Sequence, residues 1–399
     1  MKRSLSQYYT TSEISNLIAS LLDFTNVENV IDLGAGEGAL VNEVYKVLRK
    51  KASYVVADID KDNCLKLKGN KEYKVYNIDC TSQHMARRIH CKLGSFDLAV
   101  CNPPYGILEN NEFYTKLLYN MHLGYYGGCK FISSDLIFLA YNLLFLRENG
   151  ILTIILPNGA LSGERYRKFR EGLFRYYSVE RIVELPEKAF DYTEAKTGIF
   201  IIKKCRPCKS LIQLNCYSNG QLGISVFKDS TLLYNRIDFR TCCSPLNHVT
   251  SAVGGNIEIR RGKFTHKYLK ECKAPYFHTT HFRSCDGVFN ACYDDNRGIA
   301  SPNTFLMARV GKRCVGNVLL IKEGNIRYSD CVYNILVPKE YISSFVAYFN
   351  SPEYREWVKD VAHGICSYVI TKGDVEKMLL NKIDDFKTYD YNKKNTSVH

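Results

Sequence analysis

The sequence predicts an α/β fold with a mostly parallel sheet in its first half, followed by a β-rich α+β domain. Up to about residue 204, continuous apolar segments alternate with helix-like segments, a pattern typical of strands buried on both faces by crossover helices. After KKCRPCK at 203–209, the segments become shorter and are separated by Gly, Asn and Asp. We therefore expect one domain over 1–204, a second over 205–385, and a flexible polar tail over 386–399.

Apolar periodicity gives the elements in chain order. The first is an amphipathic helix at 14–24, with Ile14, Leu17, Ile18, Leu21 and Leu22 on one face. Further helices are expected at 39–50, 134–146 and 165–177, and strands at 29–34, 54–59, 75–80, 96–101, 151–157, 179–186 and 197–204. In the second half, 343–361 is expected to form a helix pair.

Composition bounds the class of protein. The 399 residues carry a net charge of +13. Residues 205–350 hold 19 Lys and Arg against 10 Asp and Glu, whereas residues 1–204 hold 27 against 23. A basic module beside a nearly neutral one favours a polyanion partner such as nucleic acid, although many basic proteins bind none.

The cysteines and the hydropathy pattern point to a cytoplasmic protein. Sixteen cysteines without an apolar leader at the N-terminus predict reduced thiols. The sequence contains no run of 18 apolar residues, so we expect no membrane-spanning helix. The CRPC spacing at 205–208 suits zinc, but no second Cys-x-x-Cys follows it, so we expect no metal site.

A glycine-rich turn follows the first strand in DLGAGEG, where Gly34, Gly36 and Gly38 alternate. Glycines at a strand-to-helix turn let a ligand approach the backbone closely. The spacing is G-x-G-x-G, which disfavours a nicotinamide dinucleotide. A tight turn without any ligand is the alternative interpretation.

Three aspartates are expected at the carboxyl ends of successive strands. Asp58 suits the two hydroxyls of a ribose, with Asp60 as its competitor, and Asp79 suits an adenine amino group. Asp32 lies where the amino-acid part of a cofactor with a free ammonium would be held. Loop aspartates and helix caps remain the alternatives for each of them.

The stretch FDLAVCNPPYG ends a buried strand at Asn102, because Pro103 and Pro104 lack an N–H and fix φ. Asn102 and Tyr105 are therefore held on a stiff turn at the carboxyl edge of the sheet, where ligands bind in open α/β sheets. A polar group beside an aromatic ring suits a flat, polar substrate.

These motifs, with SQYYTTSEI near the N-terminus, resemble the S-adenosylmethionine-dependent DNA adenine-N6 methyltransferases of the gamma group. Their order along the chain is the order in that group. The resemblance implies a Rossmann-like methyltransferase fold, S-adenosyl-L-methionine as cofactor, and double-stranded DNA as substrate. It also implies a type II restriction–modification setting with a possible cognate restriction endonuclease, a monomer on DNA, and a bacterial or archaeal cytoplasm.

The resemblance also implies roles for single residues. The adenine amine would donate its two hydrogens to Asn102 Oδ1 and the Pro103 carbonyl, with Pro104 stiffening the turn. Tyr105 would stack on the extruded base, and Phe190 would close its other face, with Tyr192 as the alternate. A core phenylalanine at a strand end is the alternative interpretation of Phe190. Lys196 would meet a phosphate. Tyr8 and Thr10 would cover the methionine end of the cofactor, beside Asp32, Gly34, Gly36 and Asn102.

Parts of the second half resemble the target-recognition domains of restriction–modification specificity proteins. Basic residues flank glycines there and are candidates for DNA contacts: Arg260, Arg261, Lys263, Arg309, Lys312 and Arg313. Plain surface charge is the alternative for each.

Three other functions stay open. Enzymes that methylate a protein glutamine amide, or guanine in ribosomal RNA, use the same Asn-Pro-Pro-Tyr logic, but without a basic domain of this length after the catalytic half. A DNA-specificity subunit with an inactive catalytic fold is the non-enzyme alternative.

Overall fold

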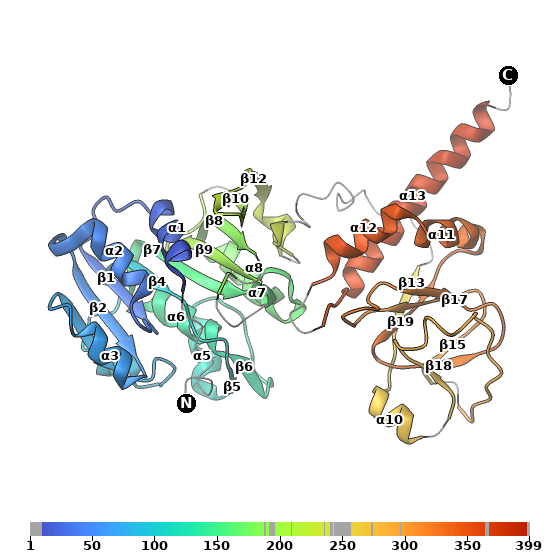
Figure 1. The fold of residues 1–399 in the computed structure, drawn as a ribbon, viewed down its shortest axis with the longest axis horizontal. Coiled ribbons are helices and arrows are strands. Elements are labelled where there is room, and N and C mark those ends of the chain that lie inside the picture. The colour runs from blue at the N-terminus through green and yellow to red at the C-terminus, as the bar shows by residue number, and fades with distance from the viewer. Residues whose placement is uncertain are drawn as a thin grey trace. The chain divides into compact units, whose positions relative to one another are not determined.

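The computed structural model divides into two compact units, Met1–Cys242 and Cys243–His399 (Figure 1). It describes residues 10–186, 189–190, 196–208, 210–234, 236–239, 242, 257–272, 274–295, 297–363 and 367–396. None of the helices in these ranges combines the length and apolar character that crossing a bilayer requires.

The first unit is built on one mixed, mostly parallel sheet in the order β11-β10-β8-β9-β7-β4-β1-β2-β3. Its central strands pair in parallel, whereas β9 is antiparallel to both β7 and β8. The strands are β1 (Asn29–Leu33), β2 (Ser53–Asp58), β3 (Tyr73–Asn77), β4 (Phe96–Cys101), β7 (Leu146–Pro157), β8 (Ser178–Leu185), β9 (Thr197–Lys203), β10 (Leu211–Ser218), β11 (Gln221–Leu222) and β12 (Val226–Asp229).

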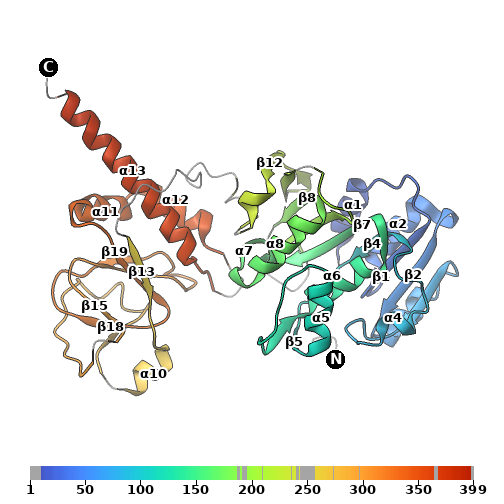
Figure 2. The ribbon, with the colours of Figure 1, turned by 180° about the vertical axis from the view of Figure 1, so that it is seen from behind.

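Helices cover both faces of this sheet (Figures 1 and 2). Val30 packs into the core cluster that includes α1 and α2, whereas the next residue, Ile31, packs into the cluster of α6 and α8. This two-sided burial explains the continuous apolar strands of the sequence. The helices are α1 (Ser12–Leu21), α2 (Ala39–Leu48), α3 (Lys61–Leu67), α4 (Met85–Arg88), α5 (Glu112–Asn120), α6 (Ser134–Phe145), α7 (Asn158–Ser162) and α8 (Arg167–Tyr176), with 3-10 turns η2 (Arg49–Lys51) and η3 (Glu164–Tyr166).

The sheet order reverses between β1 and β4. From β1 the chain moves outward to β2 and β3, and then returns to place β4 on the other side of β1. Such a switch point opens a crevice at the carboxyl ends of the two strands. Two short antiparallel strands, β5 (Ile107–Glu109) and β6 (Phe131–Ser133), follow the end of β4, and residues 110–130, which include α5, connect them. We call this pair of strands the β5–β6 hairpin.

The structure divides the chain later than the expected boundary at 204/205. Residues after 205 continue the first sheet, because β10 pairs in parallel with β8 and β12 pairs with β10. The 3-10 turn η4 (Ser230–Leu233) and the residues after it belong to the same unit. The fully buried Arg170 of α8 donates to the carbonyl of Tyr234 at 2.9 Å and to that of Ala160 at 3.0 Å, and Ile237 N donates to the Leu161 carbonyl at 2.8 Å.

The second unit holds short strands and a helical cluster, as expected for a β-rich α+β domain. One sheet has the order β13-β19-β16-β17, and a smaller one has the order β14-β18-β15. The strands are β13 (Glu258–Arg261), β14 (Tyr276–Phe277), β15 (Ile299–Ala300), β16 (Phe305–Ala308), β17 (Val318–Leu320), β18 (Ile326–Tyr328) and β19 (Val332–Leu336), and the helices are α10 (His266–Glu271), η6 (Lys339–Tyr341), α11 (Ile342–Phe349), α12 (Pro352–Val361) and α13 (Lys372–Thr396).

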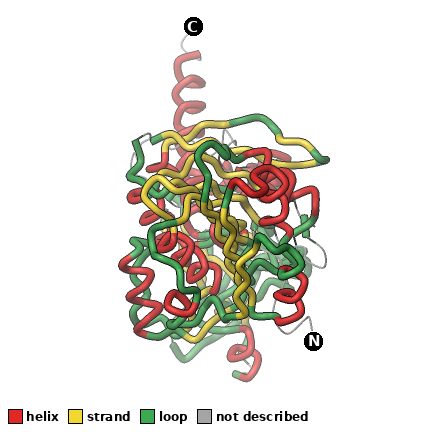
Figure 3. The backbone as a smooth tube through the Cα atoms, turned by 90° about the vertical axis from the view of Figure 1, so that its left-hand side faces the viewer, coloured by secondary structure: helices red, strands yellow, loops and turns green. Residues whose placement is uncertain are grey.

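The helices of this unit close its core on Phe305, Phe345 and Trp357. The expected tail over 386–399 is helical as far as Thr396, because α13 continues through it (Figure 3).

Candidate active site

The glycine-rich turn at the end of β1 needs its glycines. Gly34, Gly36 and Gly38 have φ of 74°, 58° and 88°, a region that other residues rarely adopt. A Cβ on Gly34 would lie 2.9 Å from Phe138 Cε1. The N–H groups of Gly34 and Ala35 both donate to the Ala57 carbonyl, at 2.8 and 3.0 Å. The turn is therefore locked to β2 and presents bare backbone on its open side.

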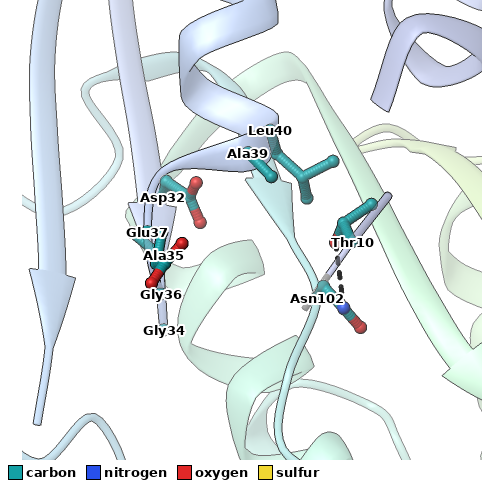
Figure 4. A pocket seen from close by; sticks show the side chains of 9 residues that line it. All are labelled: Thr10, Asp32, Gly34, Ala35, Gly36, Glu37, Ala39, Leu40 and Asn102. Carbon is teal, nitrogen blue, oxygen red and sulfur yellow. Dashed lines mark hydrogen bonds between the residues drawn. The ribbon is translucent and has the colours of Figure 1, made fainter. Parts of the chain in front are cut away.

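A pocket lies between this turn and the end of β4. Its empty volume is about 300 Å³, which includes space open to solvent. Figure 4 shows Asp32 and the turn on one side and Thr10 and Asn102 on the other. It is lined by Thr10, Asp32, Gly34, Ala35, Gly36, Glu37, Ala39, Leu40 and Asn102. Five of the residues predicted from the three separate motifs thus line one cavity: Thr10, Asp32, Gly34, Gly36 and Asn102.

Asp32 is a buried carboxyl whose oxygens have no hydrogen-bond partner among the described residues. Burial raises its pKa to about 8, and the nearby charge of Asp58 adds to the rise. A weak interaction with the backbone N–H of Val41 opposes this rise. An unsatisfied buried carboxyl is costly, so Asp32 is prepared for a cationic or hydrogen-bonding ligand.

The other two predicted aspartates hold the backbone. Asp58 accepts from Gly36 N and from Asp60 N, both at 2.8 Å, and it is 4% exposed. Asp60, its competitor, caps α3 by accepting from Asp62 N. Asp79 is exposed and accepts from Thr81 N at 2.8 Å and Oγ1 at 2.7 Å. Asp58 therefore contacts the glycine turn directly, whereas Asp79 stabilises the turn after β3.

The Asn102 side chain is held at both ends. Its Nδ2 donates to Thr10 Oγ1 at 3.0 Å, and the Tyr105 hydroxyl lies 3.3 Å from its Oδ1 and 3.4 Å from the Ile155 carbonyl. Asn102 and Tyr105 are both half-buried. Because Thr10 engages the amide nitrogen, the acceptor oxygen is turned toward the Tyr105 hydroxyl.

Ser134, a residue that the sequence analysis missed, fixes the same turn. It is 3% exposed. Its hydroxyl donates to the Pro104 carbonyl and accepts from Gly106 N at 2.8 Å, and its N–H donates to the Gly106 carbonyl at 3.0 Å. The available signal was the polar run SSD at the start of an otherwise apolar helix.

A buried carboxyl lies next to Ser134. Asp135 is fully buried and accepts hydrogen bonds from Ser133 Oγ and, at 3.1 Å, from the Tyr166 hydroxyl. Burial raises the pKa of Asp135 to about 6, although the hydrogen bonds from Ser133 and Tyr166 oppose the rise. Its partners indicate that it joins the start of α6 to η3.

Phe190 is 2% exposed and belongs to the core cluster that includes Val183 and Ile199 of β8 and β9. Burial of an apolar ring is favourable, so this position agrees with a core role for Phe190, whereas its stacking on a substrate base stays a prediction. Tyr192 and Tyr8 lie outside the described residues. Lys196 is half-buried, and its carbonyl accepts from Asn158 N at 2.8 Å.

Two of the predicted basic residues of the second unit form ion pairs with acidic neighbours. Arg260 Nε and Nη2 both donate to Glu258, and Arg261 pairs with Asp330 at 3.4 Å. Arg309 joins this group through the Asp330 carbonyl at 3.1 Å. The other three are exposed: Lys263, Lys312 and Arg313.

The fold and pocket define the class of protein: a Rossmann-like methyltransferase fold with an Asn-Pro-Pro-Tyr turn beside its glycine-rich turn. Residues 1–222 match the family described as N-6 DNA Methylase, and the chain belongs to this family.

Among characterised proteins, the chain is 26% identical over 233 residues to the type I restriction enzyme MpnII methylase subunit of Mycoplasma pneumoniae, covering 53% of this chain and 42% of that one. It is 24% identical over 216 residues to the type II methyltransferase M.BsuBI of Bacillus subtilis, covering 47% and 41%. The chain thus spans about two fifths of the length of these relatives.

A solved structure, that of the type IIG restriction endonuclease BpuSI, resembles nearly the whole chain. The match has a TM-score of 0.51 at 14% identity and covers 94% of this chain and 60% of that one. It supports the fold of the chain.

Proposed function

We propose that the protein is a site-specific DNA methyltransferase that transfers a methyl group from S-adenosyl-L-methionine to the N6 amine of an adenine in double-stranded DNA. The observation that carries the proposal is the shared pocket: Asn102 lies across from the glycine-rich turn and from the unsatisfied Asp32. A cofactor site and an amine acceptor thus adjoin, as direct transfer between two bound molecules requires.

The residues of the pocket fit the cofactor. Asp32 would bind the α-ammonium, and the bare backbone at Gly34 and Gly36 would lie against the methionine moiety. Asp58 lies outside the pocket lining, but it accepts from Gly36 N and would accept the ribose hydroxyls beside this turn. Thr10 closes the pocket beside Asn102. When bound, the cofactor supplies an electrophilic methyl group on a positively charged sulfur.

Asn102 and the Pro103 carbonyl would accept the two hydrogens of the adenine amine. Two acceptors draw the nitrogen toward tetrahedral geometry and direct its lone pair at the methyl group. The Asn102 oxygen carries no titrating charge, so it accepts without taking the proton, which leaves after attack. Thr10, Tyr105 and Ser134 keep this geometry ready before the substrate arrives, which is the kind of preorganisation that accelerates transfer.

Adenine inside a duplex cannot reach this pocket, so the base has to be extruded at a cost of a few kcal/mol. Tyr105 would offset part of that cost by stacking, about 1–3 kcal/mol per contact. Its half-buried position next to Asn102 suits this role. The basic second unit would provide target recognition, with Arg260, Arg261, Lys263, Arg309, Lys312 and Arg313 as candidate contacts and Lys196 as a further one.

The biological setting belongs to the same proposal. We assign the protein to a restriction–modification system of bacterial or archaeal cytoplasm, acting as a monomer on DNA with or without a partner endonuclease. Its relatives named above carry methylase or methyltransferase names in such systems, and this supports the assignment.

Modification-aware sequencing of DNA from cells expressing the chain tests the proposal, with cells expressing Asn102→Ala as the matched control. We expect N6-methyladenine at one recurring motif with the wild type and none with the variant. Labelled methyl groups on a release factor or on ribosomal RNA, with unmodified DNA, would instead support the protein-glutamine or RNA alternatives. Absence of S-adenosylmethionine binding in calorimetry would support the inactive specificity subunit.

A further inference from the structure

The hairpin of β5 and β6, which Figure 1 labels, carries two large apolar side chains that are exposed to solvent. Ile107 is 72% exposed and Phe131 is 47% exposed. Ile107 pairs with Ser133, and Glu109 pairs with Phe131. Paired residues share a face, so Ile107 and Phe131 are diagonal neighbours on one face, about 7 Å apart.

The hairpin is anchored, so this exposed pair has a defined position. On the opposite face, Ile132 is 2% exposed and Leu108 packs against the same core cluster. In the segment that connects the two strands, Asn110 Nδ2 donates to the carbonyls of Tyr126 and Cys129 at 3.0 and 2.9 Å. Half of the hairpin's apolar side chains thus hold it to the unit, while the other half is presented outward.

The base of the hairpin is continuous with the catalytic turn. Ile107 follows Tyr105 by two residues, and Ser134 bonds both Pro104 and Gly106 at this junction. A base that enters between Asn102 and Tyr105 must leave its neighbours in the duplex close to this junction. Whatever occupies the hairpin face therefore approaches together with the substrate.

We propose that Ile107 and Phe131 form an apolar wedge that contacts the DNA stack next to the extruded adenine. This inference rests on the proposed function. Apolar side chains inserted at a base step compensate for lost stacking, and Ile and Phe have the required shape and chemistry. Lys130 supports DNA as the occupant, because its exposed ammonium lies 5.3 Å from the centre of the Phe131 ring, where it can meet a phosphate. The carboxylate of Glu109, on the same face, would repel a DNA phosphate at its own position. The apolar pair would therefore contact bases and not the DNA backbone.

The test compares the double variant Ile107→Ala/Phe131→Ala with the wild-type chain on a duplex containing the motif found by sequencing. Ile224→Ala/Phe227→Ala is the matched control, because these side chains are 75% and 58% exposed. Phe227 lies in β12 and Ile224 lies two residues before that strand, and β12 is separated from β4 by β10, β8, β9 and β7.

We expect the wedge variant to lose on the order of 10-fold in kcat/KM for DNA, and to lose the fluorescence rise of 2-aminopurine placed at the target. Cofactor affinity and melting temperature should match the wild type. On a duplex whose target adenine is mismatched, the deficit should largely disappear, because such a base costs less to extrude. The control variant should behave as wild type on both duplexes.

Several outcomes would overturn the inference. One is wild-type activity in the wedge variant on the matched duplex, and another is an equal deficit on matched and mismatched duplexes. A wild-type dimer in sedimentation that the wedge variant dissociates would assign the face to a second copy of the chain. If the wild type methylates no adenine in any duplex, the proposed function itself fails and takes the inference with it.

Discussion

Asp32 offers a prediction in which cofactor binding and stability respond in opposite directions. Its carboxyl is buried and has no hydrogen-bond partner in the part of the chain that the structure describes, and its pKa is raised to about 8 from the ordinary 3.8. The cofactor ammonium would need the ionised form. In the free protein at pH 7, only about one carboxyl in ten is ionised, because each pH unit below the pKa costs about tenfold.

The affinity of the wild type for S-adenosylmethionine should therefore rise about tenfold from pH 6 to pH 7 and level off near pH 8. Above that it should fall, because an α-amino group loses its proton with a pKa of about 7.7–8.0. Asp32→Asn should remove the acidic limb and bind weakly throughout. Calorimetry from pH 6 to pH 9, in two buffers of different ionisation enthalpy, measures both the affinity and the proton released.

The same carboxyl should make the free protein less stable as pH rises. The folded state retains the proton that the unfolded state loses above about 3.8, so stability falls between about pH 4 and pH 8. The full difference is on the order of 6 kcal/mol, since each pKa unit corresponds to about 1.4 kcal/mol. Asp32→Asn should flatten this fall and melt at higher temperature at pH 8, whereas Asp62→Asn, on the exposed start of α3, should change neither property.

A flat affinity of the wild type between pH 6 and pH 8 would refute this reasoning. An acidic limb of the same steepness in Asp32→Asn would refute it equally, because another group would then be titrating. A lower melting temperature for Asp32→Asn at pH 8 would show that the carboxyl has a stabilising partner inside the protein.

Three further predictions concern the catalytic turn and the DNA contacts. Asn102→Ala should lower methyl transfer by about 100-fold or more while leaving cofactor affinity close to wild type; lost cofactor binding in calorimetry would contradict the assigned role. Ser134→Ala removes two hydrogen bonds to the turn, at about 1 kcal/mol each, and should lower single-turnover rates about 10-fold or more with unchanged cofactor affinity; an unchanged rate would mean that the prolines alone hold the turn. Arg260→Ala/Arg261→Ala should weaken DNA binding and reduce the salt slope by about 1–2, and Glu258→Gln should tighten binding by releasing Arg260; an unchanged slope in filter-binding titrations would place the interface elsewhere.

The sheet and the centre of the site were predictable because local patterns determine them. Apolar runs of strand length indicate the buried strands. Gly34 adopts a left-handed φ that other residues disfavour, and Pro103 ends the strand after Asn102. Since parallel strands end at one edge of a sheet, the pocket between β1 and β4 followed from the order of the motifs.

The remainder depended on contacts that sequence spacing does not encode. Ser134 acts through hydrogen bonds to residues 28 and 30 positions away, and the polar run SSD at the helix start does not by itself reveal these partners. Phe190 is apolar, and the sequence alone does not show whether such a side chain packs in the core or contacts a ligand. In the structure it packs with residues of β8 and β9. The change of sequence pattern after 203–209 lies within the first unit and does not mark its end. The sequence could not show this, because the pairing of β10 with β8 joins residues that are far apart in the chain.

The strands that follow residue 204 determine how the catalytic unit can be separated or exchanged. A fragment that stops at Lys204 would uncover the hydrogen-bonding edge of β8 and take the Tyr234 carbonyl away from a guanidinium sealed inside the protein. Such a fragment should aggregate, whereas one that stops at Cys242 should remain folded. Exchange of the second unit, the proposed target-recognition part, should therefore be tolerated after residue 242 and disfavoured at Cys205–Cys208.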